Sequence, residues 1–309
     1  MLIGIDASRA TRAERTGTER YSLEIIRHLL RLPTASNHLW RLYVDEAATQ
    51  TFSDELAIGD WANVDVRHLP SRRMWTHRAL SGEVLNNRPD VLFVPSHVIP
   101  FVAPPSRLPP SVVTVHDLGY RTWPELHTRK QRAYLDLSTR WSAAVAKRVI
   151  CVSQATADDL QHAYGTNPAK INVVHEGIDR RAFVSGGRET GHNGSSPCGR
   201  PYALYVGTIQ PRKNLARIMQ AYANLVASHS IEWDLVLAGK PGWYSDSLFQ
   251  QAHELNLADR IHLPGYVPDN DLPALLENAR FFCFPSLHEG FGLPVLEAQA
   301  MGVPLVTAN

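Results

Sequence analysis

Short apolar runs alternate with amphipathic helical patterns along most of this chain. In the first half the strand-like runs are "LIGID", "LWRLYV", "VDVRHL", "DVLFVP", "SVVTVHD", "RVICVS" and "KINVVHE". Helical patterns lie between some of them, at residues 18–32, 75–87, 129–147 and 154–164, the last with Ser153 as its N-cap. This alternation is typical of βα units and a mainly parallel sheet, so the sequence predicts an α/β fold.

The alternation stops at residues 184–200, "VSGGRETGHNGSSPCGR", and then restarts. The stretch is rich in Gly and Ser, which favours a linker. After it come "YALYVG", "WDLVLAG", "RIHLPGYV" and "RFFCFPS", with helical patterns from about Lys213 and near residues 247–255 and 270–278. We therefore expect two Rossmann-like domains, at residues 1–183 and 201–309. The second is expected to be incomplete, because the chain stops just after the strand-like end of "GVPLVTAN" and would leave a sheet edge open.

Composition narrows the class of protein. The formal net charge of +1 gives no electrostatic reason to expect a nucleic-acid partner. Cys151, Cys198 and Cys283 are widely separated, and two of them lie in apolar runs, which favours a reducing, cytoplasmic compartment. The N-terminus lacks the pattern of a signal peptide, and no run of about 18 apolar residues predicts a membrane span.

The stretch "EGFGLPVLE", residues 289–297, places a carboxylate on each side of a glycine-rich turn. Pro294 suits the first turn of a helix. Backbone N–H groups of the turn would point out of the helix N-terminus, where a phosphate or a sugar hydroxyl can accept them. The residues that carry these groups are Gly290, Phe291, Gly292 and Leu293. Glu289 and Glu297 would accept from paired hydroxyls, which suits a nucleotide sugar; a helix cap with a surface glutamate is the alternative.

A second stretch, "YVGTIQPRKN", follows a strand and leads into a helix. Arg212 and Lys213 would lie at the N-terminus of that helix, where cations are unfavourable unless an anion is shared between them. A diphosphate would satisfy both, with bidentate contacts from Arg212 and a point charge from Lys213. An exposed basic turn is the alternative interpretation.

Two weaker signals lie in the first half of the chain. His116, in "TVHDLGY", follows a strand at the carboxyl edge where open α/β sheets bind ligands. A loop histidine with structural contacts is the alternative. Gly17, in "RTGTERY", lies between the first strand and a helix that Thr16 or Thr18 would cap.

Two further patterns favour structural interpretations. The acidic triplet at residues 269–271 resembles a divalent-metal motif, but capping of the following helix explains it better, and no metal site is predicted. The helical pattern at residues 129–148 is basic and could rest on an anionic membrane surface. Because Asp136 interrupts the charge, a solvated helix face is favoured.

Several of these stretches together closely resemble family 4 retaining glycosyltransferases of the GT-B fold. They are "YVGTIQPRKN", "AGKPGW", "LPGYVPDNDLPALLENA" and "FPSLHEGFGLPVLEAQAMGVPLVTAN", and the resemblance extends back through "VHDLGY" and "GIDASRATRAERTGTERY". It is strongest to a bacterial subset that includes mannosyltransferases of O-antigen and exopolysaccharide assembly. Members of the family continue by roughly another third of a domain, so the resemblance also implies an incomplete second domain.

The resemblance implies a role for each candidate residue. Glu289 would contact the donor sugar, and His116 would face the transferred sugar from the first domain, so these two are the expected catalytic residues. Glu297 would hold the nucleotide ribose. Arg212 and Lys213 would neutralise the leaving diphosphate, which makes a metal unnecessary.

Two positions depart from the commonest family pattern. Gly17 matches the glycine-bearing loop near the phosphates, but Glu19 stands where many members have another glycine. Thr208 stands where many members carry an arginine, which leaves Arg212 and Lys213 to supply the charge.

The sequence therefore predicts a hexosyltransferase that moves a hexose from a nucleotide diphosphate sugar to a glycan or lipid-linked acceptor in cell-surface polysaccharide synthesis. Mannose is the favoured sugar and GDP-mannose the leading donor, no cofactor is expected besides the donor, and peripheral contact with the inner face of the membrane is compatible. Front-face substitution with retention is favoured, because no residue stands out as a covalent nucleophile. A non-catalytic nucleotide-binding fragment and a nucleotide-sugar hydrolase or epimerase on the same fold are the alternatives.

Overall fold

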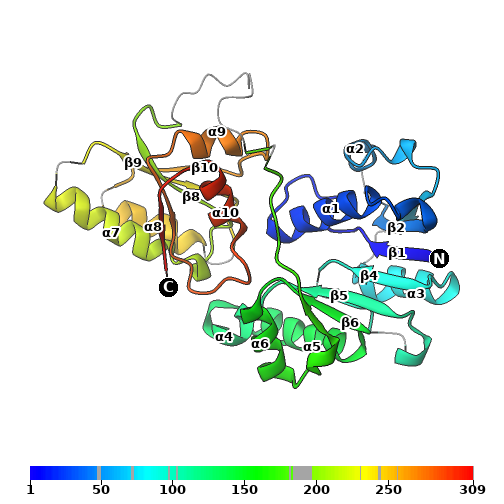
Figure 1. Ribbon diagram of the computed structural model, residues 1–309. Coiled ribbons are helices and arrows are strands. Elements are labelled where there is room, and N and C mark those ends of the chain that lie inside the picture. Colours follow the sequence, from blue (N-terminus) through cyan, green and yellow to red (C-terminus); the bar gives the residue numbers. More distant parts are fainter. Residues whose placement is uncertain are drawn as a thin grey trace. The chain divides into compact units, whose positions relative to one another are not determined.

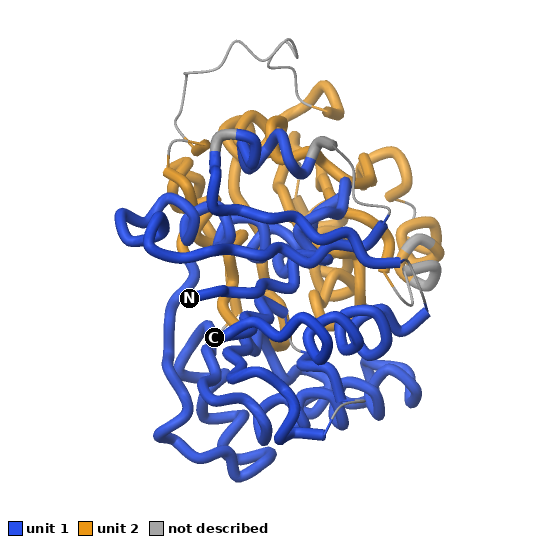
Figure 2. The backbone as a smooth tube through the Cα atoms, turned by 90° about the vertical axis from the view of Figure 1, so that its right-hand side faces the viewer, with its two compact units in different colours: residues 1–176 blue, residues 177–309 orange. Residues whose placement is uncertain are grey.

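The computed structural model describes residues 1–46, 50–70, 73–96, 98–101, 104–180, 182–183, 197–229, 231–242, 245–255 and 257–308. The chain forms two compact units, residues 1–176 and 177–309 (Figure 2). Each unit has a parallel sheet with helices packed against it (Figure 1), which confirms the predicted α/β class. Most of the predicted linker, residues 184–196, lies outside the described residues, and the domain boundaries that it implied stay a prediction.

The first unit is built on a seven-stranded parallel sheet with the order β3-β2-β1-β4-β5-β6-β7. Its strands are β1 (Leu2–Asp6), β2 (Leu39–Asp45), β3 (Val64–Leu69), β4 (Val91–Val94), β5 (Ser111–Val115), β6 (Arg148–Cys151) and β7 (Ile171–Val173). Each of the strand-like runs expected in this half is therefore a strand. The order of strands reverses between β1 and β4, and such a switch point is where open α/β sheets bind ligands.

The helices of the first unit are α1 (Gly17–Leu30), α2 (Gln50–Glu55), α3 (Ser81–Asn86), α4 (Gly119–Thr122), α5 (Arg129–Val145) and α6 (Gln154–Tyr164). A π-helical segment, η3 (Thr76–Leu80), runs directly into α3 and completes the helix expected at residues 75–87. The N-cap prediction for α6 is confirmed, since Thr156 N donates to Ser153 Oγ at 3.1 Å. No helical pattern predicted α2 and α4, which are only six and four residues long.

Successive residues along strands of the first sheet pack into two different apolar clusters, one on each face of the sheet. Leu42 and Val44 of β2 pack in a cluster with α1, whereas Tyr43 between them belongs to the cluster on the other face. Phe93 and Leu92 of β4 divide in the same way. Because successive side chains of a strand point to opposite faces, the continuous apolar runs noted in the sequence bury both faces of this sheet.

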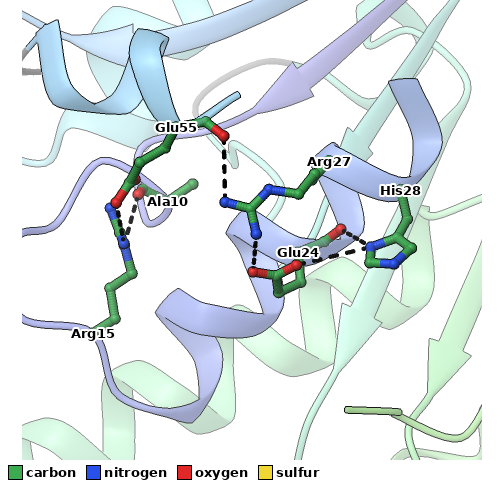
Figure 3. A network of polar contacts seen from close by, with 6 residues as sticks. All are labelled: Ala10, Arg15, Glu24, Arg27, His28 and Glu55. Carbon is green, nitrogen blue, oxygen red and sulfur yellow. Dashed lines mark hydrogen bonds and ion pairs between the residues drawn. The ribbon is translucent and has the colours of Figure 1, made fainter. Parts of the chain in front are cut away.

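The loop of residues 7–16, which leads to Gly17, is tied to α2 by charge (Figure 3). Arg15 donates to both carboxylate oxygens of Glu55, at 3.0 and 2.6 Å, and its Nε donates to Ala10 O at 3.3 Å. Arg27 on α1 contacts the carboxylate of Glu24 and the backbone oxygen of Glu55. A bidentate arginine–carboxylate pair restricts the orientation of both partners, so Arg15 ties this loop to Glu55, which Arg27 in turn connects to α1.

The basic residues at positions 129–148 do not all lie on one helix. Helix α5 ends at Val145, and Lys147 and Arg148 lie beyond it. Asp136 on α5 accepts from Arg121 at 2.7 Å and from Tyr164 at 2.9 Å, so it joins α5 to α4 and α6. No helix formed by the described residues combines the length and apolar character needed to cross a membrane.

The second unit has a five-stranded parallel sheet with the order β10-β9-β8-β11-β12. The strands are β8 (Tyr202–Val206), β9 (Asp234–Ala238), β10 (Ile261–Gly265), β11 (Phe281–Phe284) and β12 (Leu305–Thr307). The helices are α7 (Leu215–Ser228), α8 (Ser245–Glu254), α9 (Leu272–Glu277) and α10 (Leu293–Ala300). The order of strands reverses between β8 and β11, so the loops after these two strands meet at a second switch point.

Glycines allow the carboxyl ends of β8, β9 and β10 to approach closely. Gly239 follows β9 with φ at +146°, and a Cβ atom there would lie only 1.8 Å from the backbone oxygen of Gly207. The N–H group of Gly239 donates to Gly265 O at 2.7 Å. Backbone atoms therefore contact one another directly where β8, β9 and β10 end. The loop that carries Arg212 and Lys213 lies at the same edge of the sheet.

Candidate functional site

The loops that follow β8 and β11 bring Arg212, Lys213 and Glu289 together. Lys213 Nζ donates to Glu289 Oε1 at 2.5 Å, and the Arg212 guanidinium lies 3.2 Å from Glu289 Oε2. The Lys213 ammonium also lies 4.9 Å from the centre of the Phe284 ring. Both cations are largely buried, with side chains 12% and 10% exposed, whereas that of Glu289 is 23% exposed. The cluster is therefore mostly desolvated and keeps its largest opening at the carboxylate.

Backbone contacts hold these two loops against one another. Leu287 N donates to Arg212 O at 2.9 Å, and Asn214 Nδ2 donates to Pro285 O at 3.1 Å. The Arg212 guanidinium also donates to the backbone oxygen of His288. Because these contacts do not need a ligand, the positions of the two cations are set in advance.

The two cations keep Glu289 ionised. Burial alone would raise the pKa of this carboxyl group, but the Lys213 ammonium and the Arg212 guanidinium outweigh burial, and the pKa of Glu289 lies below its usual value. The carboxylate is therefore a weak base and a good acceptor of hydroxyl hydrogens. A guanidinium group and an ammonium group that lie side by side suit an anionic group of a ligand.

The cations lie just before a helix, as predicted, although the helix begins two residues later than expected. Arg212 and Lys213 belong to a one-turn 3-10 helix, η7 (Pro211–Lys213). Asn214 follows in the left-handed conformation with φ at 60°, and α7 begins at Leu215. Asn is among the few residues that adopt this conformation readily, and the resulting turn separates the basic pair from α7.

The predicted start of the helix in the glycine-rich stretch is confirmed. Helix α10 begins at Leu293 with Pro294 in its first turn. Gly292 is the N-cap residue with φ at +98°, a backbone conformation that favours glycine. Gly290 and Phe291 lie in the turn before it, and Glu297 is buried in α10 with 5% exposure. A buried carboxylate on this helix needs hydrogen-bond partners, which agrees with an inward-facing role rather than a surface role.

In the first unit, His116 directly follows β5 and has acceptors at both ring nitrogens. Its Nε2 lies 2.9 Å from Pro95 O, and its Nδ1 lies 3.1 Å from Glu176 Oε1. A carbonyl oxygen only accepts, so Nε2 carries a proton in that bond; the contact with Glu176 needs one more proton, on Nδ1 or on the carboxyl group. The Tyr21 ring and the imidazole pack in a T-shaped arrangement, with 4.7 Å between ring centres. Both nitrogens of the imidazole are thus engaged in hydrogen bonds.

Glu176 is a candidate that sequence reasoning missed. Its side chain is 8% exposed, close to the 9% of His116, and it is the last residue of the first unit. It follows β7 in "INVVHEGID", while His116 follows β5, with only β6 between the two strands. Both residues therefore lie where a strand ends, at the carboxyl edge of the same sheet. This shared position was the signal that could have identified Glu176.

Gly17 is the first residue of α1, and its predicted neighbour Thr16 is the N-cap. Glu19 accepts a hydrogen bond from Thr16 N at 3.2 Å, so the residue that departs from the family pattern completes a capping box. A Cβ atom at Gly17 would meet no atom within 4 Å. Packing therefore does not explain the glycine, whereas close approach of a ligand would.

One group of side chains in the described residues has the atoms to hold a metal ion: Cys198, Asp234 and His262. Asp234 already accepts from Arg260 Nε at 3.2 Å and lies 2.9 Å from His262 Nε2, so an ion-pair network between β9 and β10 accounts for the group. The acidic triplet at residues 269–271 supplies the N-cap residue of α9, Asp271, as expected. Within the described residues, however, its side chain accepts no capping hydrogen bond.

Comparisons with known proteins agree with this architecture. The family model "Glycosyltransferase Family 4" matches residues 15–182, and the model "Glycosyl transferases group 1" matches residues 192–309. The chain is 34% identical over 217 residues to O-antigen chain mannosyltransferase B of Escherichia coli. The matched region covers 66% of this chain and 54% of that protein. The chain spans about half the length of the curated relatives that it matches.

Two solved structures share the fold across nearly the whole chain. WaaG, a glycosyltransferase involved in lipopolysaccharide biosynthesis, matches with a TM-score of 0.71 at 18% identity, over 99% of this chain and 80% of that one. HepE of Anabaena, solved in complex with UDP and glucose, matches with a TM-score of 0.68 at 18% identity and the same coverage. The GT-B fold predicted from the sequence is therefore confirmed.

Proposed function

The chain belongs to glycosyltransferase family 4, and from this premise we propose that it moves a hexose from a nucleotide diphosphate sugar to a glycan or lipid-linked acceptor. Mannose is the favoured hexose, because the Escherichia coli relative is a mannosyltransferase of the O-antigen chain. GDP-mannose is accordingly the favoured donor. The proposed setting is the synthesis of a cell-surface polysaccharide, with peripheral contact at the inner face of the membrane.

The observation that carries this proposal is the cluster of Arg212, Lys213 and Glu289. A sugar that leaves a nucleoside diphosphate places growing negative charge on the diphosphate, and preorganised cations in a desolvated site stabilise that charge. Arg212 and Lys213 meet this requirement, since both are held by backbone or side-chain contacts before a ligand arrives. Glu289 would accept hydroxyl hydrogens of the sugar.

The remaining donor contacts are proposed from the turn before α10 and from the helix itself. Gly290, Phe291, Gly292 and Leu293 lie where backbone N–H groups would meet the phosphates or the sugar, and Glu297 would hold the ribose. The binding of UDP by HepE is compatible with a nucleotide at a similar place in the GT-B fold. Gly17 is proposed as a further donor-binding residue, since a Cβ atom there would meet no atom within 4 Å.

In the proposed reaction the bond between the anomeric carbon and the diphosphate oxygen breaks, and the electron pair remains on that oxygen. The acceptor hydroxyl attacks the same face of the sugar, and its proton passes to the departing phosphate, so the configuration is retained. His116 is proposed to contact the transferred sugar without removing a proton from it, because both its ring nitrogens already face acceptors.

A titration followed by product analysis tests the proposal. We expect calorimetry to detect binding of GDP or UDP, and Glu297→Gln to weaken it by about tenfold or more through loss of a charged acceptor. Glu254→Gln, on the exposed end of α8, is the matched control and should leave the affinity unchanged. Incubation with GDP-mannose and a glycan acceptor should then yield an extended glycan.

Other outcomes of the same experiment distinguish the alternatives. Donor binding without any product supports a non-catalytic nucleotide-binding protein. Release of free or epimerised sugar in the absence of an acceptor supports a hydrolase or an epimerase. If neither nucleotide binds, the donor proposal is wrong.

We expect Glu176→Gln to lower turnover by about tenfold while the affinity for the nucleotide stays within about twofold, as is typical of residues that orient a functional histidine. Glutamine keeps the size and one oxygen acceptor but replaces the carboxyl group that contacts Nδ1 of His116 by a neutral amide. Nitrogen NMR of the His116 ring should show a changed hydrogen-bond environment at Nδ1 in this variant. An unchanged ring signal together with unchanged turnover would show that Glu176 has no positioning role.

A further inference from the structure

The first unit contains a cavity at the edge of the sheet opposite His116. Its volume is about 610 Å³, and its walls are the segments that lead into β4, β5, β6 and β7. His116 and Glu176 follow β5 and β7 at the carboxyl edge, so the cavity lies at the amino edge of the same strands. A ligand in it would therefore be separate from the proposed transfer site.

Four cationic side chains line this cavity, and its lining includes no acidic residue: the cations are Arg88, Lys147, Arg148 and Lys170. Within the described part of the chain none of them forms an ion pair. Four cations in a lining without acidic residues give the cavity a positive potential, which attracts anions.

Three of the cations use some of their donors to hold the cavity walls. Lys170 Nζ donates to the backbone oxygens of Ala143 and Ala144 at the end of α5, at 3.0 and 2.8 Å. Arg88 donates to Leu108 O at 2.9 Å, and Arg148 donates to a backbone oxygen in the segment before β7. Guanidinium and ammonium groups have more N–H donors than these contacts use. The cations are thus fixed in position and still able to donate to a ligand.

Lys147 differs from the other three. Its backbone N–H donates to Ser111 O at 2.8 Å, which fixes the residue just before β6, while its side chain is exposed. Lys147 can therefore be replaced without breaking a wall contact, which makes it the residue to test.

Burial lowers the pKa of Lys170, whose ammonium group holds two backbone oxygens, and a bound anion would oppose that shift.

We propose that this cavity binds an organic phosphate, whose phosphate group contacts the four cations and whose carbon skeleton packs against Pro105, Leu108 and Pro110. Two observations favour this class over a bare inorganic ion. The volume lies in the range of small-molecule sites, about 300–1,000 Å³, and these apolar side chains are part of the wall. The phosphate could belong to a soluble metabolite or to a lipid headgroup.

Calorimetric titration with inorganic pyrophosphate tests the phosphate contacts. The full chain carrying Lys213→Ala is the background, because this substitution weakens the proposed donor site and isolates the cavity. We expect Lys147→Glu in that background to weaken pyrophosphate binding by about tenfold or more, since it reverses one of the converging charges. Lys130→Glu, an exposed lysine at the other end of α5, is the matched control and should have no effect.

Flotation with vesicles of phosphatidylglycerol identifies the source of the phosphate. Binding to these vesicles that Lys147→Glu abolishes and Lys130→Glu preserves would assign the cavity to a lipid headgroup. Binding of pyrophosphate without binding to vesicles would assign it to a soluble organic phosphate. Equal effects of the two substitutions on pyrophosphate, or no binding in the background chain, would overturn the proposal.

Discussion

Replacing Lys213 with alanine is expected to lower turnover with a nucleotide diphosphate sugar by about a hundredfold or more, the range found when a preorganised donor to a developing negative charge is removed. Lys213 is the closest cation to Glu289, at 2.5 Å. Without it, one of the two cations that are proposed to stabilise a leaving diphosphate is gone. The measurement is kcat and KM for the donor, beside the affinity for the free nucleotide.

The same substitution also leaves Glu289 with one cation fewer, so a structural effect has to be separated from a catalytic one. The double variant Lys213→Ala with Glu289→Gln removes both members of the pair and relieves the uncompensated charge. We expect it to regain stability but not turnover. Lys130→Ala on the surface of α5 controls for the loss of a lysine. Turnover of the single variant within a few-fold of the parent would contradict the proposed role of Lys213.

Gly239→Ala is expected to destabilise the second unit by about 4 kcal/mol or more, a size that is exceptional for a single methyl group and reflects backbone strain. The added Cβ atom would lie 1.8 Å from Gly207 O, and φ at +146° is a conformation that alanine rarely adopts. The backbone of β8 or β9 would have to move, and with it the loop that holds Arg212 and Lys213. Chemical denaturation followed by circular dichroism measures the loss.

A second glycine gives the matched control for this prediction. Gly82 lies inside α3, and a Cβ atom there would meet no atom within 4 Å. Gly82→Ala should therefore be neutral or should stabilise the protein by about 0.5–1 kcal/mol, the usual gain for this change inside a helix. A free energy of unfolding for Gly239→Ala within about 1 kcal/mol of the parent would show that the sheet tolerates the close contact.

Apolar runs predicted the sheets well, and a strand buried along its whole length, such as β9, corresponds to a nearly continuous run. The run "VDVRHL" became β3 with the same bounds, and "LWRLYV" became β2, which extends one residue further, to Asp45. Helix ends were less predictable where a cap lies outside the helical pattern. Asn214 delayed the start of α7 to Leu215, since a left-handed residue in a turn leaves no periodic signal.

The sequence singled out Arg212, Lys213 and Glu289 separately but did not predict that they contact one another. Arg212 and Lys213 were expected to face a diphosphate, and nothing in the local sequence shows that Glu289, 76 residues away from Lys213, lies against them. That contact depends on β8 and β11 being neighbours, which follows from the strand order and not from spacing along the chain. Glu176 was missed for the same reason, because its contact with His116 crosses β6.

The contact between Lys213 and Glu289 makes the carboxylate an internal competitor for any incoming anion. A singly charged anion that displaced Glu289 would replace one negative partner of Lys213 by another and would leave the carboxylate desolvated without its nearest cation. A diphosphate brings more charge and can engage Arg212 at the same time. We therefore expect the contact between Lys213 and Glu289 to favour a diphosphate over phosphate monoesters and inorganic phosphate at this site.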